Sequence, residues 1–151
     1  HYKRIQDMKD FTIKELEHSN IAEKAGIKNT MDKHARRNYE AFTDKVLDVL
    51  RERWGSPIVV SSGYRCADLN RMVGGVYDSY HLGKDDKAAV DIVPKTGSID
   101  ELYRLLKEMV RLNEVVVDKV LFEHSGASRW LHVQYRRVGV NRGILVDRYN
   151  A

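Results

Sequence analysis

The chain has 151 residues, of which 42% are hydrophobic and 32% charged, and this composition is typical of a globular protein rather than a disordered or fibrous one. Its length corresponds to one domain that buries its own core, and a single cysteine excludes an internal disulfide. The net charge of +4 suits an anionic polymer such as nucleic acid or bacterial cell wall. The basic residues are spread along the chain, however, so an uncommitted basic surface explains the charge equally well.

No apolar run in the sequence is long enough to span a bilayer. The first residues are basic but are not followed by the hydrophobic stretch of a signal peptide. We therefore expect no membrane insertion and no visible secretion signal.

The first third of the chain is predicted to be helical. Thr12 and Glu15 have the spacing of a capping box, which predicts a short helix that ends near Gly26. Apolar residues then recur at helical spacing, which predicts one amphipathic helix over residues 32–54.

A short β-branched run at residues 58–60 predicts a buried strand, and it places Arg65 just beyond the strand end, where functional loops are common. A short helix is predicted over residues 67–72. The loop that follows, residues 74–87, is long for a compact domain, and such length more often indicates function than filler.

The second half of the chain is predicted to contain most of the strands. Residues 89–93 predict another buried strand, and a second capping box predicts a helix over residues 98–112. Further strands are predicted over residues 115–122, 130–136 and 144–146. This order favours a single α+β domain with an antiparallel sheet packed against helices.

Two polar residues stand out because they lie inside apolar strands. An unpaired carboxylate at Asp91 would cost several kcal/mol, so this position requires a cation or strong hydrogen-bond donors. His132 alternates with Leu131 and Val133 and therefore points to the opposite face. A zinc ion held by Asp91, His132 and His81 satisfies both residues, and a structural Asp–His pair without metal does so equally well.

Five short segments follow one another along the chain: SSGYR (61–65), Asn70 with VGG (73–75), SYH (79–81), AAVDI (88–92) and WLHV (130–133). In this order they resemble the motifs of the zinc D-alanyl-D-alanine carboxypeptidase family. That family belongs to the LAS group of peptidoglycan metallopeptidases, whose fold the hedgehog signalling domain shares. Residues 11–16 and 27–30 also resemble the N-terminal segment of phage-type and prophage-type members. The resemblance implies one zinc peptidase-like domain over residues 1–151, with residues 1–30 packed on it.

The resemblance also implies roles for individual residues. The motif histidines and aspartate correspond to three zinc ligands, His81, Asp91 and His132. Arg65 corresponds to the arginine beside the metal that holds a substrate carbonyl or carboxylate.

Other implied roles concern the surroundings of the metal. Ser79, Tyr64 and Trp130 belong to the same motifs and are expected to orient a ligand or to contact substrate. Glu123 resembles the family's acid ahead of the last ligand and is the expected general base. His124 is a second candidate for that role, although a surface histidine explains it as well.

The chain departs from the family pattern between the first two ligands. Residues 84–87 add a charged insertion there and displace Gly83. Closing a slightly longer loop costs only a few tenths of a kcal/mol, so both ligands can still meet. Asp85 or Asp86 could replace a ligand, or both could be solvated loop carboxylates.

The implied function is a zinc metallopeptidase that hydrolyses an amide bond in peptidoglycan stem peptides, as a D,D-carboxypeptidase or an endolysin-type endopeptidase. We expect a monomer that acts on the bacterial wall, in the periplasm or at the cell exterior, with a phage or prophage lysin as one form. The alternative is a metal-free module of the same fold that binds wall peptides or a protein. A nucleic-acid partner is not expected, because the chain has no aromatic-basic motif or recognition helix.

Overall fold

The computed structural model describes residues 8–150, and for residues 148–150 the backbone alone. It is an α+β fold around a five-stranded sheet in the order β1-β2-β4-β3-β5. The strands are β1 (Ile58–Ser62), β2 (Lys87–Pro94), β3 (Lys119–Ser125), β4 (Ser128–Arg136) and β5 (Ile144–Asn150). The helices are α1 (Ile13–Glu17), α2 (Asn20–Ala25), α3 (Lys33–Phe42), α4 (Asp48–Trp54), α5 (Ala67–Met72) and α6 (Ile99–Arg111), with a π-helical segment (Thr43–Leu47) and a 3₁₀ turn (Tyr80–Leu82).

The predicted α+β class is confirmed, but the sheet is mixed rather than wholly antiparallel. β1, β2, β4 and β3 pair antiparallel, whereas β5 pairs parallel with β3. Both edges of β4 are already occupied by β2 and β3, and the chain that leaves β4 adds to the outer edge of β3. The short connection over residues 137–143 starts β5 at the end where β3 begins, and this makes the two strands parallel.

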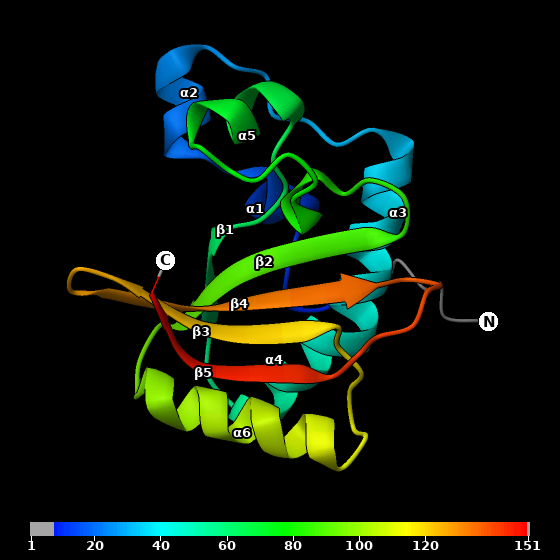
Figure 1. Cartoon of the computed structure of the whole chain (residues 1–151). Coiled ribbons are helices and arrows are strands. Elements are labelled where there is room, and N and C mark those ends of the chain that lie inside the picture. Colours follow the sequence, from blue (N-terminus) through cyan, green and yellow to red (C-terminus); the bar gives the residue numbers. More distant parts are fainter. Residues whose placement is uncertain (1–7, 151) are drawn as a thin grey trace.

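The two faces of the sheet differ in character because side chains alternate along each strand. One face is apolar and fully buried, with Val90 and Ile92 of β2, Leu131 and Val133 of β4, and Val120 of β3. Figure 1 shows α3 and α4 behind the sheet, α6 along its lower edge, and α2 with α5 above β2. The opposite face carries polar residues and forms the floor of the candidate site.

The predicted helix over residues 32–54 forms one continuous helical run. It comprises α3, the π-helical segment and α4, with α-helical backbone angles at the junction residues Thr43 and Asp48. Its buried face contributes Tyr39, Phe42 and Leu50 to the core.

The helix predicted from Thr12 to Gly26 is two helices instead of one. The capping box at Thr12 and the left-handed stop at Gly26 are both present. His18 adopts an extended conformation between the two helices, and the side chain of Ser19 caps α2 by accepting from the backbone N–H of Ala22. Local capping by Ser19 therefore interrupts the helix that the outer signals delimit.

The N-terminal segment packs on the rest of the fold as far as it is described. Phe11, Leu16 and Ala22 are buried, and the first two belong to the main core. Residues 1–7, which include His1, lie outside the described residues. The strand predicted over residues 115–122 begins only at Lys119. Val115 and Val117 are buried as the pattern suggests, but they lie in the loop before the strand.

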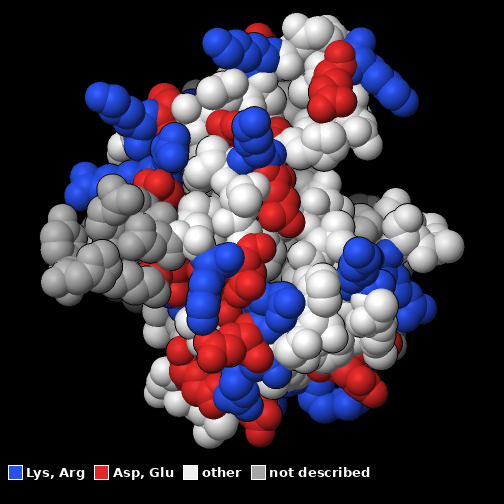
Figure 2. All heavy atoms as spheres, turned by 180° about the vertical axis from the view of Figure 1, so that it is seen from behind, with Lys and Arg blue, Asp and Glu red and all other residues white. Residues whose placement is uncertain are grey.

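The basic side chains of the described residues are distributed over the surface, as the sequence suggests, rather than gathered in one patch. On the face shown in Figure 2, Lys and Arg side chains lie among Asp and Glu side chains. Within residues 8–150, no helix combines the length and apolar character that crossing a membrane requires.

Candidate metal centre

Asp91 and His132 face each other across neighbouring strands. They are direct partners in the β2–β4 ladder, and His132 Nδ1 lies 3.0 Å from Asp91 Oδ1. Asp91 is only 9% exposed, although it carries a carboxylate. Its burial beside His132 explains how an apolar strand tolerates an acidic residue.

His81 approaches the same carboxylate from the loop above the sheet. It lies in the 3₁₀ turn and is buried, with Nε2 3.4 Å from Asp91 Oδ1. Its other nitrogen, Nδ1, donates a hydrogen bond to the Gly63 carbonyl oxygen at 2.7 Å. The lone pair of Nε2 is therefore available to bind a metal. One ligand atom from each of His81, Asp91 and His132 lies within 4.8 Å of the others.

The protonation preferences of Asp91 and His81 suit a cation in the cluster. Burial alone would raise the pKa of Asp91, but the neighbouring imidazoles of His81 and His132 hold it well below its usual range. Burial lowers the pKa of His81. Burial also disfavours charged His132, but its hydrogen bond to Asp91 and the charge of Asp91 outweigh this and raise its pKa. Two imidazole nitrogens and an ionised carboxylate form a donor set typical of catalytic zinc, so these residues fit the metal.

The loop that delivers His81 is anchored on α3 and β2. The Tyr39 hydroxyl donates to the carbonyl oxygens of His81 and Ala89, at 3.2 and 2.7 Å, and is fully buried. The Asn38 amide donates to the carbonyl oxygens of Gly83 and Asp85. These contacts hold the loop on both sides of its charged insertion.

The carboxylates of the insertion do not join the cluster. Asp86 is buried away from it, in an ion pair with Arg136 and a hydrogen bond from the backbone N–H of Gly139. Asp85 is held through its backbone by His34 and Asn38. The structure therefore gives these residues the role of closing the longer loop.

A cleft of about 470 Å³ opens above the cluster and contains Glu123. Glu123 Oε1 lies 3.9 Å from His132 Nδ1 and accepts a 3.0 Å hydrogen bond from Trp130 Nε1. Glu123 and Trp130 are direct partners across β3 and β4, so the ladder places both on the face that carries His132. His124, the next residue in β3, points to the opposite face and does not line the cleft.

Arg65 lies at the other side of the cluster. Its Nη2 is 4.0 Å from Asp91 Oδ2, and its Nη1 donates to Asn70 Oδ1 at 3.3 Å. Gly75 passes so close that a Cβ atom there would lie 2.0 Å from Asn70 Oδ1 and 3.0 Å from Arg65 Nη1. Only glycine at this position lets the loop close over the arginine.

The sequence profile of the family described as Peptidase M15 matches residues 9–134. The chain belongs to the peptidase M15 family. Members are peptidases of the zinc D-alanyl-D-alanine carboxypeptidase type, and the matched range contains His81, Asp91 and His132. No curated protein matches the chain.

Two further residues implied by the M15 resemblance differ in position. Ser79 lines the cleft, and its hydroxyl accepts from the backbone N–H of His81, so it stabilises the turn and not the ring. Tyr64 is 9% exposed and packs edge-on against Tyr39, outside the cleft lining. Tyr64 therefore supports the wall behind the M15 cleft.

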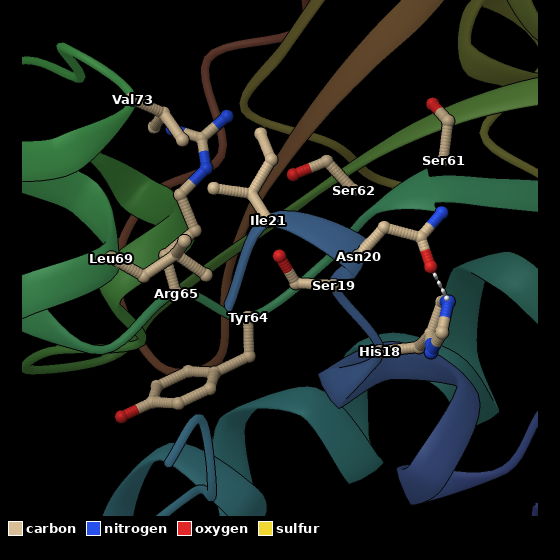
Figure 3. A pocket seen from close by; sticks show the side chains of 10 residues that line it. All are labelled: His18, Ser19, Asn20, Ile21, Ser61, Ser62, Tyr64, Arg65, Leu69 and Val73. Atoms are coloured by element: carbon tan, nitrogen blue, oxygen red, sulfur yellow. Dashed lines mark hydrogen bonds between the residues drawn. The ribbon is translucent and has the colours of Figure 1, made fainter. Parts of the chain in front are cut away.

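A second hollow of about 390 Å³ lies on the far side of Arg65. Figure 3 shows Arg65 extending past Leu69 toward Val73, with Ile21 and Ser62 across the hollow. Arg65 and Val73 line both this hollow and the cleft, so they form the wall between the two. The second hollow contains none of His81, Asp91 and His132.

Sequence reasoning missed several residues that support the M15 site. The helical spacing predicts only that Asn38 and Tyr39 lie in a helix, whereas the structure buries Asn38 fully, and a buried amide requires specific partners. Gln134 lies two residues beyond His132 on the same face, and its Oε1 is 2.9 Å from His132 Nε2. That i, i+2 spacing on a strand is the signal that could have found it.

Proposed function

We propose that this M15 peptidase is a zinc enzyme that hydrolyses an amide bond in peptidoglycan stem peptides. The observation that carries the proposal is the buried, ionised Asp91 between two imidazoles, each of which directs one nitrogen toward it. His81, Asp91 and His132 would hold the metal and leave one position open for substrate or water.

The residues around the cluster divide the chemistry among them. A bound zinc ion would supply Lewis acidity, polarising the scissile carbonyl and lowering the pKa of water. Glu123, which lines the cleft, would take a proton from the attacking water and pass it to the leaving amine. Trp130 fixes the carboxylate of Glu123 through its 3.0 Å hydrogen bond. Arg65, whose Nη2 lies 4.0 Å from Asp91 Oδ2, would stabilise negative charge on the substrate oxygen.

The lining of the cleft supports a peptide with small side chains. Gly74, Gly75 and Val76 line the cleft together with Trp130, and the two glycines offer backbone without side-chain bulk. Alanine-containing stem peptides fit such a wall, and the hollow beyond Arg65 leaves room for the continuing chain. Substrates of this kind place the enzyme at the bacterial cell wall.

The decisive experiment measures zinc and cleavage in the same preparation. We expect one zinc per chain by elemental analysis, cleavage of defined muropeptides, and loss of cleavage on chelation that zinc addition reverses. Mass spectrometry of the products identifies the bond and separates carboxypeptidase from endopeptidase action. Undiminished cleavage by metal-free protein would contradict the proposal, and a chain that takes up no zinc would favour the metal-free binding module.

A further inference from the structure

Behind His132 a second carboxylate is buried that takes no part in the chemistry proposed above. Asp118 precedes β3 and is 0% exposed. Its carboxylate accepts hydrogen bonds from Arg142 Nε at 2.9 Å and Arg142 Nη2 at 2.7 Å, and a third from the backbone N–H of Arg142. Burial alone would raise the pKa of Asp118, but the hydrogen bonds from Arg142 lower it to about 2. At neutral pH Asp118 is therefore ionised and can accept hydrogen bonds but cannot donate them.

Gln134 connects this carboxylate to the metal cluster. Its Nε2 donates to Asp118 Oδ2 at 3.2 Å, and its Oε1 lies 2.9 Å from His132 Nε2. Because Asp118 accepts and cannot donate, the NH₂ group of Gln134 must face Asp118. The carbonyl oxygen of the amide must then face His132.

The direction of the amide fixes the ring of His132. An amide oxygen only accepts, so Nε2 of His132 must carry a hydrogen and donate it. The lone pair available to a metal is then on Nδ1, the nitrogen that lies 3.0 Å from Asp91 Oδ1. Hydrogen bonds of this kind determine which nitrogen of a histidine binds a metal.

We propose that Asp118 and Gln134 are positioning residues: Asp118 orients the amide of Gln134, which holds His132 in the tautomer that presents Nδ1 to the metal. The inference rests on the proposed zinc site. It assigns neither residue a contact with substrate.

The test exchanges the two functional groups between the two positions. Gln134→Leu removes the acceptor and should weaken zinc binding about 10- to 100-fold. Gln134→Glu turns a second carboxylate toward Asp118, and Asp118→Asn removes the acceptor-only partner, so each should also weaken binding. The double variant Asp118→Asn/Gln134→Glu restores one carboxylate facing one amide, with the acceptor still toward His132. It should bind zinc about 10-fold more tightly than the sum of the single effects predicts.

Two measurements read the outcome without relying on activity. Competition with a chromophoric chelator gives the zinc affinity, and ¹⁵N–¹H NMR of the zinc-loaded protein shows which nitrogen of His132 carries hydrogen. Asp147→Asn is a matched control, because it removes a surface carboxylate whose 3.4 Å partner is Lys107 and should leave the affinity unchanged. If Asp118→Asn does not fold, Gln134→Leu and Gln134→Glu still provide both measurements.

The outcomes separate this inference from the proposed function. Wild-type protein that takes up no zinc would refute the zinc site itself. Wild-type protein that binds zinc while Gln134→Leu keeps the same affinity and the same Nε2–H signal would overturn the positioning role alone. A weaker affinity with an unchanged tautomer and no recovery in the double variant would also overturn it, because it would show a packing effect.

Discussion

His81 and His132 direct nitrogen atoms toward one carboxylate, but the protein holds the two rings in different ways. The His81 ring is directed by a main-chain carbonyl, that of Gly63, and lies in a loop. The His132 ring is directed by a side chain, Gln134, and lies in a central strand. The main-chain support uses no side-chain group, but it requires glycine at position 63, because a Cβ there would lie 2.3 Å from the Leu16 carbonyl oxygen. The side-chain support depends on the amide of Gln134. The strand-borne ligand is therefore the one whose orientation depends on a side-chain functional group, whereas the loop ligand depends on a backbone that only glycine allows.

Removal of either ring should have the largest effect, whichever way the ring is held. His81→Ala and His132→Ala should each lose zinc and reduce kcat/KM by at least about 10³-fold, because metal assistance is worth several kcal/mol. Elemental analysis and steady-state kinetics on a defined muropeptide measure both effects. If His81→Ala alone retained stoichiometric zinc, the loop histidine would not be a ligand, and the two rings could not be compared as two ways of holding one.

Substitution of the proposed base on the strand side should reduce catalysis without loss of metal. Glu123→Gln keeps the hydrogen bond from Trp130 within reach but cannot take a proton, so kcat should fall about 10²- to 10⁴-fold. The neighbouring His124→Gln is the control, because His124 points to the opposite face of β3. Equal losses in the two variants would show that Glu123 is not the base.

Loss of the loop anchor should affect stability more than chemistry. Tyr39→Phe leaves the carbonyl oxygens of His81 and Ala89 without the hydroxyl that donates to them. Such a buried loss costs about 1–3 kcal/mol of unfolding free energy, measured by urea denaturation. A variant as stable as wild type would mean that these carbonyls find other donors and that the loop does not depend on the Tyr39 hydroxyl.

Acid should weaken the support behind the strand-borne ligand. The pKa of Asp118 is lowered from 3.8 to about 2, so this group stabilises the fold above about pH 4 and its contribution is lost as pH falls toward 2. The shift corresponds to about 2 kcal/mol of unfolding free energy. Urea denaturation from pH 5 to pH 2 should show the fall, and Asp118→Asn should flatten it. An equal pH dependence in this variant would assign the effect to other carboxylates.

The strand-borne half of the cluster was accessible from the sequence because strand side chains alternate with a period of two. Asp91 and His132 each interrupt an apolar run, and desolvation makes such positions require partners. The ladder then pairs the two residues directly. Glu123 followed from its place before the last ligand, and the pairing with Trp130 brings it to the same face.

Other features depend on contacts between distant segments, which local patterns do not encode. The anchoring of the His81 loop comes from Asn38 and Tyr39, more than forty residues earlier in the chain. The parallel pairing of β5 follows from the end of β3 at which the connection after β4 starts the strand, and not from the sequence of β5. The break at His18 arises because Ser19 caps a second helix. The outer signals, Thr12 and Gly26, by themselves predict one helix.

The direct pairing of Asp91 with His132 also has a consequence in time. The two residues are 41 positions apart, and they face each other only in one register of β2 and β4. A slip of one residue would turn His132 to the apolar face, so a misregistered intermediate has no complete donor set. Zinc uptake during refolding should therefore be delayed until this pairing is correct. A fluorescent zinc indicator would then report when β2 and β4 pair in the native register.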